Sequence, residues 1–351
     1  MTELYTEAVE LLQDLIRLPS FSKEEDQTAE VIFAWLKSRG VEVRRHKNNV
    51  WAVNRHFDRT KPSVLLNSHH DTVRPNKGYT RDPFAPVIED GKLYGLGSND
   101  AGGSLVSLLA LFVNFYEKEN LAYNLIMTAT AEEENSGSDG LESLLKHLPE
   151  HEFAVVGEPT DMHLAVAEKG LLVIDGVALG KSGHAAHNNT ENALLKAVED
   201  INWINDYDFE KESGTLGKVK MSVTQIHAGQ QHNVVPASCQ FVVDVRVNDC
   251  YSNREVFEII DRHTKSQMTA RSFRLNSSSI PLVHPLVQAG KALGRETYGS
   301  PTVSDQAVLS GPSLKLGVGS SLRSHSADEF VLLDEIKQGI ELYIRLFGKI
   351  L

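Results

Sequence analysis

Hydrophobic residues near the start of the chain recur every three or four positions, which predicts an amphipathic helix over residues 4–16. A second helix is expected directly after it. Ser22 and Glu25 have the form of a capping box at its beginning, and the helical pattern extends through Trp35. Gly40 is suited to the left-handed conformation that ends many helices. The chain is therefore expected to open with two consecutive helices.

The middle of the chain is built differently, from short and continuously apolar runs. These runs cover residues 63–67, 123–130, 153–156 and 313–316, and a helical stretch over 104–117 lies before the second of them. Strands that are apolar throughout are typical of sheets with both faces covered, and such sheets are mostly parallel. The pattern predicts an α/β fold in which a mostly parallel sheet is flanked by helices.

From residue 171 the order of the expected elements changes. Strands are expected at 171–179, 219–226, 238–247 and 269–275, and helices at 190–202 and 254–267. In chain order this is β-α-β-β-α-β, which is a ferredoxin-like unit. The polar stretch at 276–279 is typical of a boundary. We therefore expect an inserted domain at 171–279 between two parts of a larger domain, at 1–170 and 280–351.

Length and charge restrict the class of protein. A chain of 351 residues exceeds what one core usually holds, in agreement with two domains. Its 35 Lys and Arg against 47 Asp and Glu give a net charge of −12, which disfavours nucleic acid and anionic membranes as partners. Two cysteines, Cys239 and Cys250, cannot form a disulfide framework. Because acidic residues stand where a secretory signal would need cations, we expect a cytoplasmic protein.

Side chains able to bind a metal follow the expected strands at their carboxyl ends, where open α/β sheets place ligand sites. They are His69, His70 and Asp71 after 63–67, Asp100 after the run KLYGLG, Glu132, Glu133 and Glu134 after 123–130, Glu158 after 153–156, and His325 after 313–316. Taken singly, a histidine at a strand end is more often a structural residue, and a Glu-Glu-Glu run is more often a solvated face. The joint pattern favours a metal centre.

The types of side chain in this set indicate which ions it would hold. Histidine and carboxylate without thiolate suit zinc, manganese or cobalt, and a carboxylate can bridge two ions. In an extended chain His69 and Asp71 lie on the same side, so Asp71 can orient the His69 ring. His70 points away and is expected to be a packed or exposed residue without a role in the site. Neighbouring Glu133 and Glu134 cannot both face one ion comfortably. One would bind it, and the other would handle protons.

Eight short motifs in order resemble those of one known family. They are HHD at 69–71, GLGSNDAGG at 95–103, TAEEENSG at 130–137, VGEPT at 156–160, GKSGHAAH at 180–187, NVVP at 233–236, DVR at 244–246 and SHSADEF at 324–330. This set resembles the di-zinc amidohydrolase and peptidase family of acetylornithine deacetylase, succinyl-diaminopimelate desuccinylase, aminoacylases and glutamate carboxypeptidases. The resemblance implies a zinc-peptidase-like catalytic domain, and it implies that the inserted ferredoxin-like domain is a lid and a dimerisation domain.

The resemblance also implies a set of metal ligands. His69, Asp100 and Glu158 would hold one zinc ion. Asp100, Glu134 and His325 would hold the other. Asp100 would then bridge the two ions, for which cobalt or manganese are alternatives to zinc.

Further roles are implied for residues around the metals. Asp71 would orient a ligand, and Glu133 would be the general base. His184 of the inserted domain would stabilise the oxyanion in the active site of a neighbouring subunit, which implies a homodimer formed through that domain. Asn233 and Arg246 would bind the carboxylate of the substrate. Because catalysis would use the inserted domain, we expect hinges near Gly170 and at 276–279.

The function implied by the resemblance is hydrolysis of the amide of a small N-acyl amino acid. N-acetyl-ornithine, N-acetyl-citrulline or an N-succinyl analogue would be the substrate, in arginine biosynthesis. A zinc carboxypeptidase or dipeptidase on the same scaffold is the main alternative, since both reactions cleave an amide beside a free carboxylate. A non-catalytic binding homologue is a further alternative, although such a protein would be expected to have lost the base or a ligand. Whether Ser304 and Asp305 contact the substrate stays open.

Overall fold

The computed structural model describes residues 2–188 and 190–351, and the chain divides into two compact units. The first contains the residues up to Val166 together with Ser279–Tyr298 and Ser304–Leu351. The second contains Ala167–Ser278 and Gly299–Val303. The sequence placed the inserted part at 171–279, and it did not predict that the short segment at 299–303 groups with that part.

The first unit is built around a mixed sheet. Among the described residues the strands of this sheet are β1 (Val43–His46), β2 (Asn49–Val53), β3 (Ser63–His69), β6 (Asn124–Thr130), β7 (Phe153–Val156), β8 (Leu164–Glu168), β15 (Ser278–Ser279), β16 (Thr297–Ser300) and β17 (Ser313–Lys315). One or two residues of β8, β15 and β16 group with the second unit. The order is β1-β2-β6-β3-β7-β17-β8-β15, and β16 also pairs with β8. β6, β3, β7 and β17 run parallel, while β2 and β8 join this centre antiparallel. The predicted parallel sheet is therefore confirmed at its centre.

Alternate residues of the central strands face two different cores. Val64 and Leu66 of β3 join a large cluster with the long helices, and Leu65 between them joins a small cluster on the opposite face. Ile126 and Ala154 belong to the same small cluster. Because side chains alternate across a strand, both faces need an apolar cover, which explains the continuously apolar runs.

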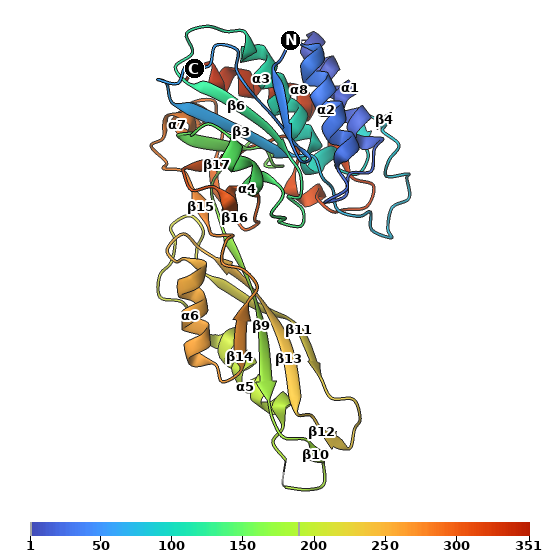
Figure 1. Ribbon diagram of the computed structural model, residues 1–351, viewed down its shortest axis with the longest axis vertical. Helices are drawn as coiled ribbons and strands as arrows, with labels where there is room; N and C mark the ends of the chain where they lie inside the picture. Colours follow the sequence, from blue (N-terminus) through green and yellow to red (C-terminus); the bar gives the residue numbers. More distant parts are fainter. Residues whose placement is uncertain (1, 189) are drawn as a thin grey trace. The chain divides into compact units, whose positions relative to one another are not determined.

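Helices cover the two faces unequally. The large cluster contains residues of α1 (Thr2–Ile16), α2 (Asp26–Ser38), α3 (Gly103–Tyr116), α7 (Pro285–Ala292) and α8 (Leu333–Phe347), and the longer of these helices are seen near β6 in Figure 1. The opposite face has the short α4 (Leu141–Leu144) and a helical turn at Asp305–Val308. α3 is buried almost all round, as its continuous apolar sequence requires. None of the described helices has the length and apolar character needed to cross a membrane.

The capping box predicted at Ser22 and Glu25 is wrong. α2 begins at Asp26, and no side chain caps its first turn. Ser22 Oγ donates a hydrogen bond to Asp71 at 2.7 Å, and the Glu25 carboxylate accepts one from the backbone N–H of Glu132 at 3.2 Å. Both side chains are thus used by turns far along the chain, and these tertiary hydrogen bonds replace the local cap.

The first unit also contains a small antiparallel sheet. It has the order β18-β5-β4 and consists of β4 (Val87–Glu89), β5 (Lys92–Tyr94) and β18 (Phe330–Leu332). The run KLYGLG at 92–97 was expected to be a strand of the open α/β sheet, followed by Asp100. Its first three residues do form a strand, but that strand is not part of the main sheet. Its strand β5 belongs to the small sheet, and Asp100 lies in the turn Ser98–Gly102 that leads into α3.

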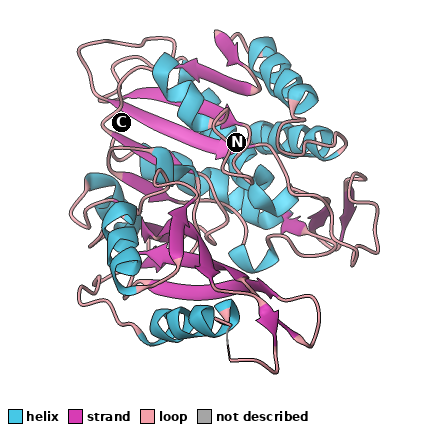
Figure 2. Ribbon diagram, turned by 60° about the horizontal axis from the view of Figure 1, so that its bottom comes forward, coloured by secondary structure: helices cyan, strands magenta, loops and turns pink. Residues whose placement is uncertain are grey.

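The second unit has the predicted β-α-β-β-α-β order. Its main elements are β9 (Gly170–Leu179), α5 (Ala193–Asp206), β11 (Lys220–Ala228), β13 (Ser238–Val247), α6 (Asn253–His263) and β14 (Gln267–Ala270). The strands form an antiparallel sheet in the order β11-β13-β9-β14. Buried and partly buried residues alternate along β9, because one face packs on α5 and α6. The ferredoxin-like unit is therefore confirmed, and Figure 2 shows its strands and helices by element type.

The ends of the elements in this unit differ from those predicted. A capping box between Ser252 and Glu255 begins α6 one residue earlier than expected. α5 begins after Asn192, whose side chain accepts from the N–H of Leu194. A two-stranded ribbon of β10 (Gly183–His184) and β12 (Val234–Val235) had no sequence signal.

One helix end in the first unit agrees with the prediction. The N–H of Gly40 reaches the carbonyl of Lys37 at the end of α2, and Gly40 has a φ of +74°, which is the expected left-handed stop.

Candidate metal centre

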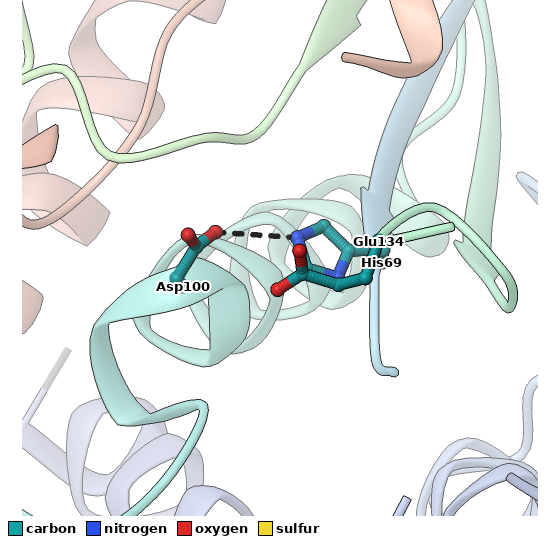
Figure 3. Close-up of side chains that lie close together, drawn as sticks. All are labelled: His69, Asp100 and Glu134. Atoms are coloured by element: carbon teal, nitrogen blue, oxygen red, sulfur yellow. Dashed lines mark ion pairs between the residues drawn. The ribbon is translucent and has the colours of Figure 1, made fainter. Parts of the chain in front are cut away.

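Elements of the first unit bring the candidate metal ligands to one place. His69 is the last residue of β3, and Glu158 follows the end of β7, two parallel neighbours whose carboxyl ends point the same way. Glu134 follows β6 on the other side of β3. Asp100 arrives from the turn before α3, and His325 from the loop after β17. Figure 3 shows the side chains of His69, Asp100 and Glu134 close together.

His69 is at the middle of this arrangement. Its Nε2 lies 3.4 Å from Asp100 Oδ1, 3.7 Å from Glu158 Oε1 and 4.0 Å from Glu133 Oε2. The side chain of His69 is 1% exposed. One imidazole nitrogen thus faces three carboxylates at separations that would fit a shared cation.

Asp100 faces two histidines with different oxygens. Its Oδ1 is the atom near His69, whereas its Oδ2 lies 3.6 Å from Nε2 of His325. His325 Nε2 also lies 3.0 Å from Glu134 Oε2. An aspartate that presents one oxygen to each side is suited to bridging two ions. The peptide bond between Asp100 and Ala101 is cis.

Two groups of side chains place ligand atoms within 4.8 Å of one another in the described residues. They are His69 with Asp100 and Glu134, and His69 with Glu133 and Glu158. The predicted ligand sets share His69, Asp100, Glu134 and Glu158 with these groups but divide them differently. They leave out Glu133, which is expected to be the base, and they add His325, which lies close to Asp100 and Glu134.

The residues present fit divalent ions. Nε2 of His69 and Oε1 of Glu158 are buried, and neither has a hydrogen-bond partner among the described residues. Buried polar atoms are normally satisfied, so a pair of unsatisfied atoms that face each other is suited to an ion between them. Imidazole nitrogen with carboxylate oxygen is also the donor set of zinc, manganese and cobalt sites.

The charges of this cluster also favour cations. Burial raises the pKa of Glu158 to about 8, and burial followed by the charge of Glu158 raises the pKa of Glu133 well above its usual value. Burial raises the pKa of Glu134, and the hydrogen bond with His325 partly offsets this increase. Burial alone would lower the pKa of His69, but the carboxylates of Asp100 and Asp71 outweigh it and raise that pKa well above its usual value.

Asp71 is placed to orient several parts of the site. Nδ1 of His69 lies 3.4 Å from Asp71 Oδ1 and 3.0 Å from the backbone carbonyl of the same residue. The Asp71 carboxylate also accepts from the backbone N–H groups of Glu133 at 3.0 Å and Glu134 at 3.1 Å. It therefore contacts both the histidine ligand and the turn that carries the expected base.

The turn after β6 is held by side chains at four consecutive amides. Ala131 N–H donates to Asn49 Oδ1 at 3.0 Å, and Glu132 N–H donates to Glu25, before the two bonds to Asp71. Sequence reasoning missed Asn49 and Glu25 in this role. No local pattern points to them, because their partners lie about a hundred positions away.

His70 and Asp305 are buried beside the site. His70 is hydrogen-bonded to Thr28 and to the carbonyl of Asn48, and burial lowers its pKa to about 4, so it is a packed residue. The Asp305 carboxylate accepts from Asn67 Nδ2 at 2.7 Å and Thr130 Oγ1 at 2.8 Å, which ties β3 to β6.

The other three expected site residues lie in the second unit. His184 is exposed on the β10–β12 ribbon, and its Nδ1 accepts from the N–H of Ala186. The carbonyl of Asn233 accepts from the N–H of Ala185, so Asn233 and His184 belong to adjacent segments. Arg246 on β13 is bonded through Nε and Nη2 to the two carboxylate oxygens of Asp244.

Comparisons with known sequences identify a family and named relatives. The profile of Peptidase family M20/M25/M40 matches residues 65–349. A succinyl-diaminopimelate desuccinylase of Cereibacter sphaeroides is 25% identical, in an alignment that covers 96% of this chain and 97% of that protein. An acetylornithine deacetylase of Photorhabdus laumondii is 27% identical, in an alignment that covers 92% of each protein.

Solved structures share the whole fold. An M20 family metallo-carboxypeptidase from Sulfolobus solfataricus superposes with a TM-score of 0.77 at 18% identity, over 97% of this chain and 98% of that one. A Bacillus subtilis protein described as a dinuclear metal binding peptidase gives 0.74 at 17% identity, over 99% of this chain and 98% of that one. At these identities the similarity establishes the arrangement of the elements in each unit.

Proposed function

The chain belongs to Peptidase family M20/M25/M40, and from this premise we propose that it is a di-metal hydrolase that removes the acyl group from a small N-acyl amino acid. The expected metals are two zinc ions, with cobalt or manganese as alternatives. The substrates that we favour are N-acetyl-ornithine, N-acetyl-citrulline and their N-succinyl analogues, which would place the reaction in arginine biosynthesis.

The observation that carries the proposal is the position of the Asp100 carboxylate between two histidines. Oδ1 lies 3.4 Å from His69 Nε2, and Oδ2 lies 3.6 Å from His325 Nε2. Glu158 lies beside His69, and Glu134 lies beside His325. Each metal position would thus have one imidazole, one glutamate and one oxygen of Asp100. These five residues would hold the two ions.

The chemistry combines the ions with the residues of the chain. When bound, a pair of divalent ions supplies Lewis-acid activation of a water molecule and of the amide carbonyl. Glu133, whose carboxylate lies 4.0 Å from the His69 ring, accepts a proton from the water as its oxygen attacks the amide carbon. Glu133 then gives a proton to the amide nitrogen as the carbon–nitrogen bond breaks. A carboxylic acid and a free amine are the products.

His184 suits the negative oxygen that forms during the attack. Because its Nδ1 accepts the hydrogen bond from Ala186 N–H, the neutral ring carries its proton on Nε2, which is then available as a donor. Donors of this kind are commonly worth about 10²–10³ in turnover. We propose that His184 reaches the active site of a partner subunit in a homodimer.

Asn233 and Arg246 are proposed to bind the carboxylate of the substrate. The Arg246 guanidinium is already paired with Asp244 through Nε and Nη2, and that pairing fixes its plane. Its Nη1 would be the donor offered to the substrate. An arginine held in this way loses less side-chain freedom on binding than a mobile one.

The names of the relatives support a deacylase over a peptidase. The desuccinylase and the deacetylase are similar to this chain over nearly its whole length at 25% and 27% identity. The proteins described as a carboxypeptidase and a peptidase are similar at 18% and 17% identity. Peptide hydrolysis is therefore the second candidate.

A substrate panel tests the proposal. Zinc-loaded protein is incubated with N-acetyl-ornithine, N-acetyl-citrulline, N-succinyl-ornithine, N-succinyl-diaminopimelate and a set of dipeptides, and the released amine is quantified. The Glu133→Gln variant serves as a control for contaminating hydrolases. We expect release from one or more acyl amino acids, and cleavage of dipeptides alone would overturn the deacylase proposal.

A further inference from the structure

One buried carboxylate outside the expected ligand set holds the turn that carries Asp100. Oε1 of Glu329 accepts from the backbone N–H of Asn99 at 2.8 Å and of Asp100 at 2.9 Å, and Oε2 accepts from that of Gly97 at 3.0 Å. Glu329 is 2% exposed. A single side chain thus binds three amides within four consecutive residues.

The fold delivers Glu329 to this place through a strand pair. β18 begins directly after Glu329 and pairs antiparallel with β5, so that Phe330 lies opposite Tyr94. The pairing continues one step, since Gly95 N–H donates to the backbone carbonyl of Glu329 at 3.0 Å. These two segments run side by side up to the turn at 97–102, and the Glu329 side chain then reaches the amides of that turn.

The turn has a conformation that helical hydrogen bonds alone do not hold. Asp100 has a φ of −117° and a ψ of +97°, outside the helical region, although α3 begins just after it. The amides of Gly97, Asn99 and Asp100 precede α3, and a buried backbone N–H needs an acceptor. A carboxylate is suited to this purpose, because hydrogen bonds to a charged acceptor are stronger than those between neutral groups.

Gly97 shows how closely this turn is packed. It has a φ of +75°, and a Cβ at this position would lie 2.5 Å from Cγ2 of Thr72. The turn therefore has little room to shift while its amides stay bonded to Glu329.

The carboxylate of Asp100 depends on the backbone that Glu329 holds. Its two oxygens face His69 and His325 at 3.4 Å and 3.6 Å, and a rotation of the turn would move both. We propose that Glu329 is a positioning residue for Asp100, which fixes the main chain of the turn so that the aspartate presents one oxygen to each metal position. This inference rests on the proposed function, in which Asp100 bridges two ions.

The experiment compares Glu329→Ala with a matched control, Asp328→Ala. Asp328 is the adjacent carboxylate and also accepts from two backbone amides at 2.9 Å, but these belong to Thr80 and Arg81, in a segment that contains no expected ligand. Two measurements are made on metal-free protein: amide hydrogen exchange in peptides that span residues 95–103, and titration with zinc by calorimetry. Neither measurement requires turnover.

In Glu329→Ala we expect faster exchange in these peptides and a zinc affinity about 10–100-fold lower, as for other residues that orient a ligand. Asp328→Ala should match the unchanged protein in both measurements. Exchange that stays as slow in Glu329→Ala would overturn the inference, and so would faster exchange with unchanged zinc affinity. If the unchanged protein binds no zinc, the proposed function itself fails, and the inference fails with it.

A second variant covers the case in which Glu329→Ala does not fold. Glu329→Gln keeps Oε1 for Asn99 and Asp100 but turns an amide nitrogen toward the N–H of Gly97. We expect faster exchange in the same peptides and a zinc affinity several-fold lower, a smaller loss than in the alanine variant. A folded Glu329→Gln protein with unchanged exchange and unchanged zinc affinity would also overturn the inference.

Discussion

Nε2 of His69 and Oε1 of Glu158 lie 3.7 Å apart, and in the described part of the chain neither atom has a hydrogen-bond partner. Each unsatisfied buried polar atom costs about 1–3 kcal/mol. A cation between them would satisfy both at once. The metal-free protein is therefore less stable than it would be with a metal bound, and the difference can be measured.

Zinc is expected to raise the melting temperature of metal-free protein by several degrees. A ligand at 100 times its dissociation constant stabilises the folded state by about 2.7 kcal/mol. Scanning calorimetry of protein stripped with a chelator, and of the same sample after zinc is added back, measures the shift. Glu158→Ala should reduce the shift, because one ligand is lost. Equal melting temperatures with and without zinc would contradict the metal centre.

Replacing Glu133 by Gln separates proton transfer from metal binding. The variant keeps the shape of the side chain and loses the group that accepts the proton, so we expect turnover to fall by about 10²–10⁴-fold. Zinc content, measured by elemental analysis, should stay at the level of the unchanged protein. Glu132→Gln changes the preceding carboxylate, which is not among the clustered ligand atoms, and should retain most activity. Normal turnover in Glu133→Gln would show that Glu133 is not the base.

The sequence predicted the parts of the site that depend on strand direction. His69 and Glu158 follow neighbouring parallel strands, and parallel strands bring their carboxyl ends to one edge of the sheet. An apolar run followed by a polar residue is a local signal, so the convergence of these side chains could be inferred from the order of residues alone. The fold of the second unit could be predicted for a similar reason, because its strands and helices alternate in a recognisable order.

The residues that support the site could not be predicted in this way. Glu329 accepts from amides more than two hundred positions earlier in the chain, and Glu25 from an amide about a hundred positions later. A glutamate in a loop has no sequence feature that separates such a role from solvent exposure. At Ser22 and Glu25 the local pattern even predicted a cap, because a capping box is defined by spacing alone and the competing partners are distant.

Asp71→Asn is expected to weaken zinc binding by about 10–100-fold. Asp71 accepts from the amides of Glu133 and Glu134 with its two oxygens, and an asparagine can offer an oxygen to only one of them. One amide would lose its acceptor, at a cost of about 1–3 kcal/mol. Calorimetric titration of metal-free protein with zinc measures the effect.

Ser22→Ala is the control for this variant. It removes only the hydroxyl that donates to Asp71, so both amide bonds stay, and the change in zinc affinity should be smaller. A zinc affinity of Asp71→Asn equal to that of the unchanged protein would show that Asp71 does not support the site.

Gly176→Ala should destabilise the second unit and leave the metal centre unaffected. Gly176 lies opposite Phe241 in the pairing of β9 with β13, and a Cβ there would come within 2.3 Å of the buried Phe241 ring. Displacing the ring costs about 1–3 kcal/mol, which chemical denaturation would detect. Gly214→Ala is the matched control, since a Cβ there meets nothing within 4 Å. Equal stability of the two variants would contradict this account of the packing.

His184 can be tested for action on a partner subunit by mixing two inactive variants. In Glu133→Gln the expected base is lost, and in His184→Ala the expected oxyanion donor is lost. If His184 serves the neighbouring site, a mixed dimer contains one site with Glu133 from one subunit and His184 from the other. With random exchange half of the dimers are mixed and each has one complete site, so activity should recover to about a quarter of that of the unchanged protein.

The measurement is the rate of acyl amino acid hydrolysis after the two variants are denatured together and refolded with zinc. Each variant refolded alone is the control, and it should stay at its own low rate. If His184 acts within its own subunit, every mixed dimer has one site without the base and one without the histidine. The mixture would then show only the average of the two separate rates. This result would rule out an active site shared between subunits.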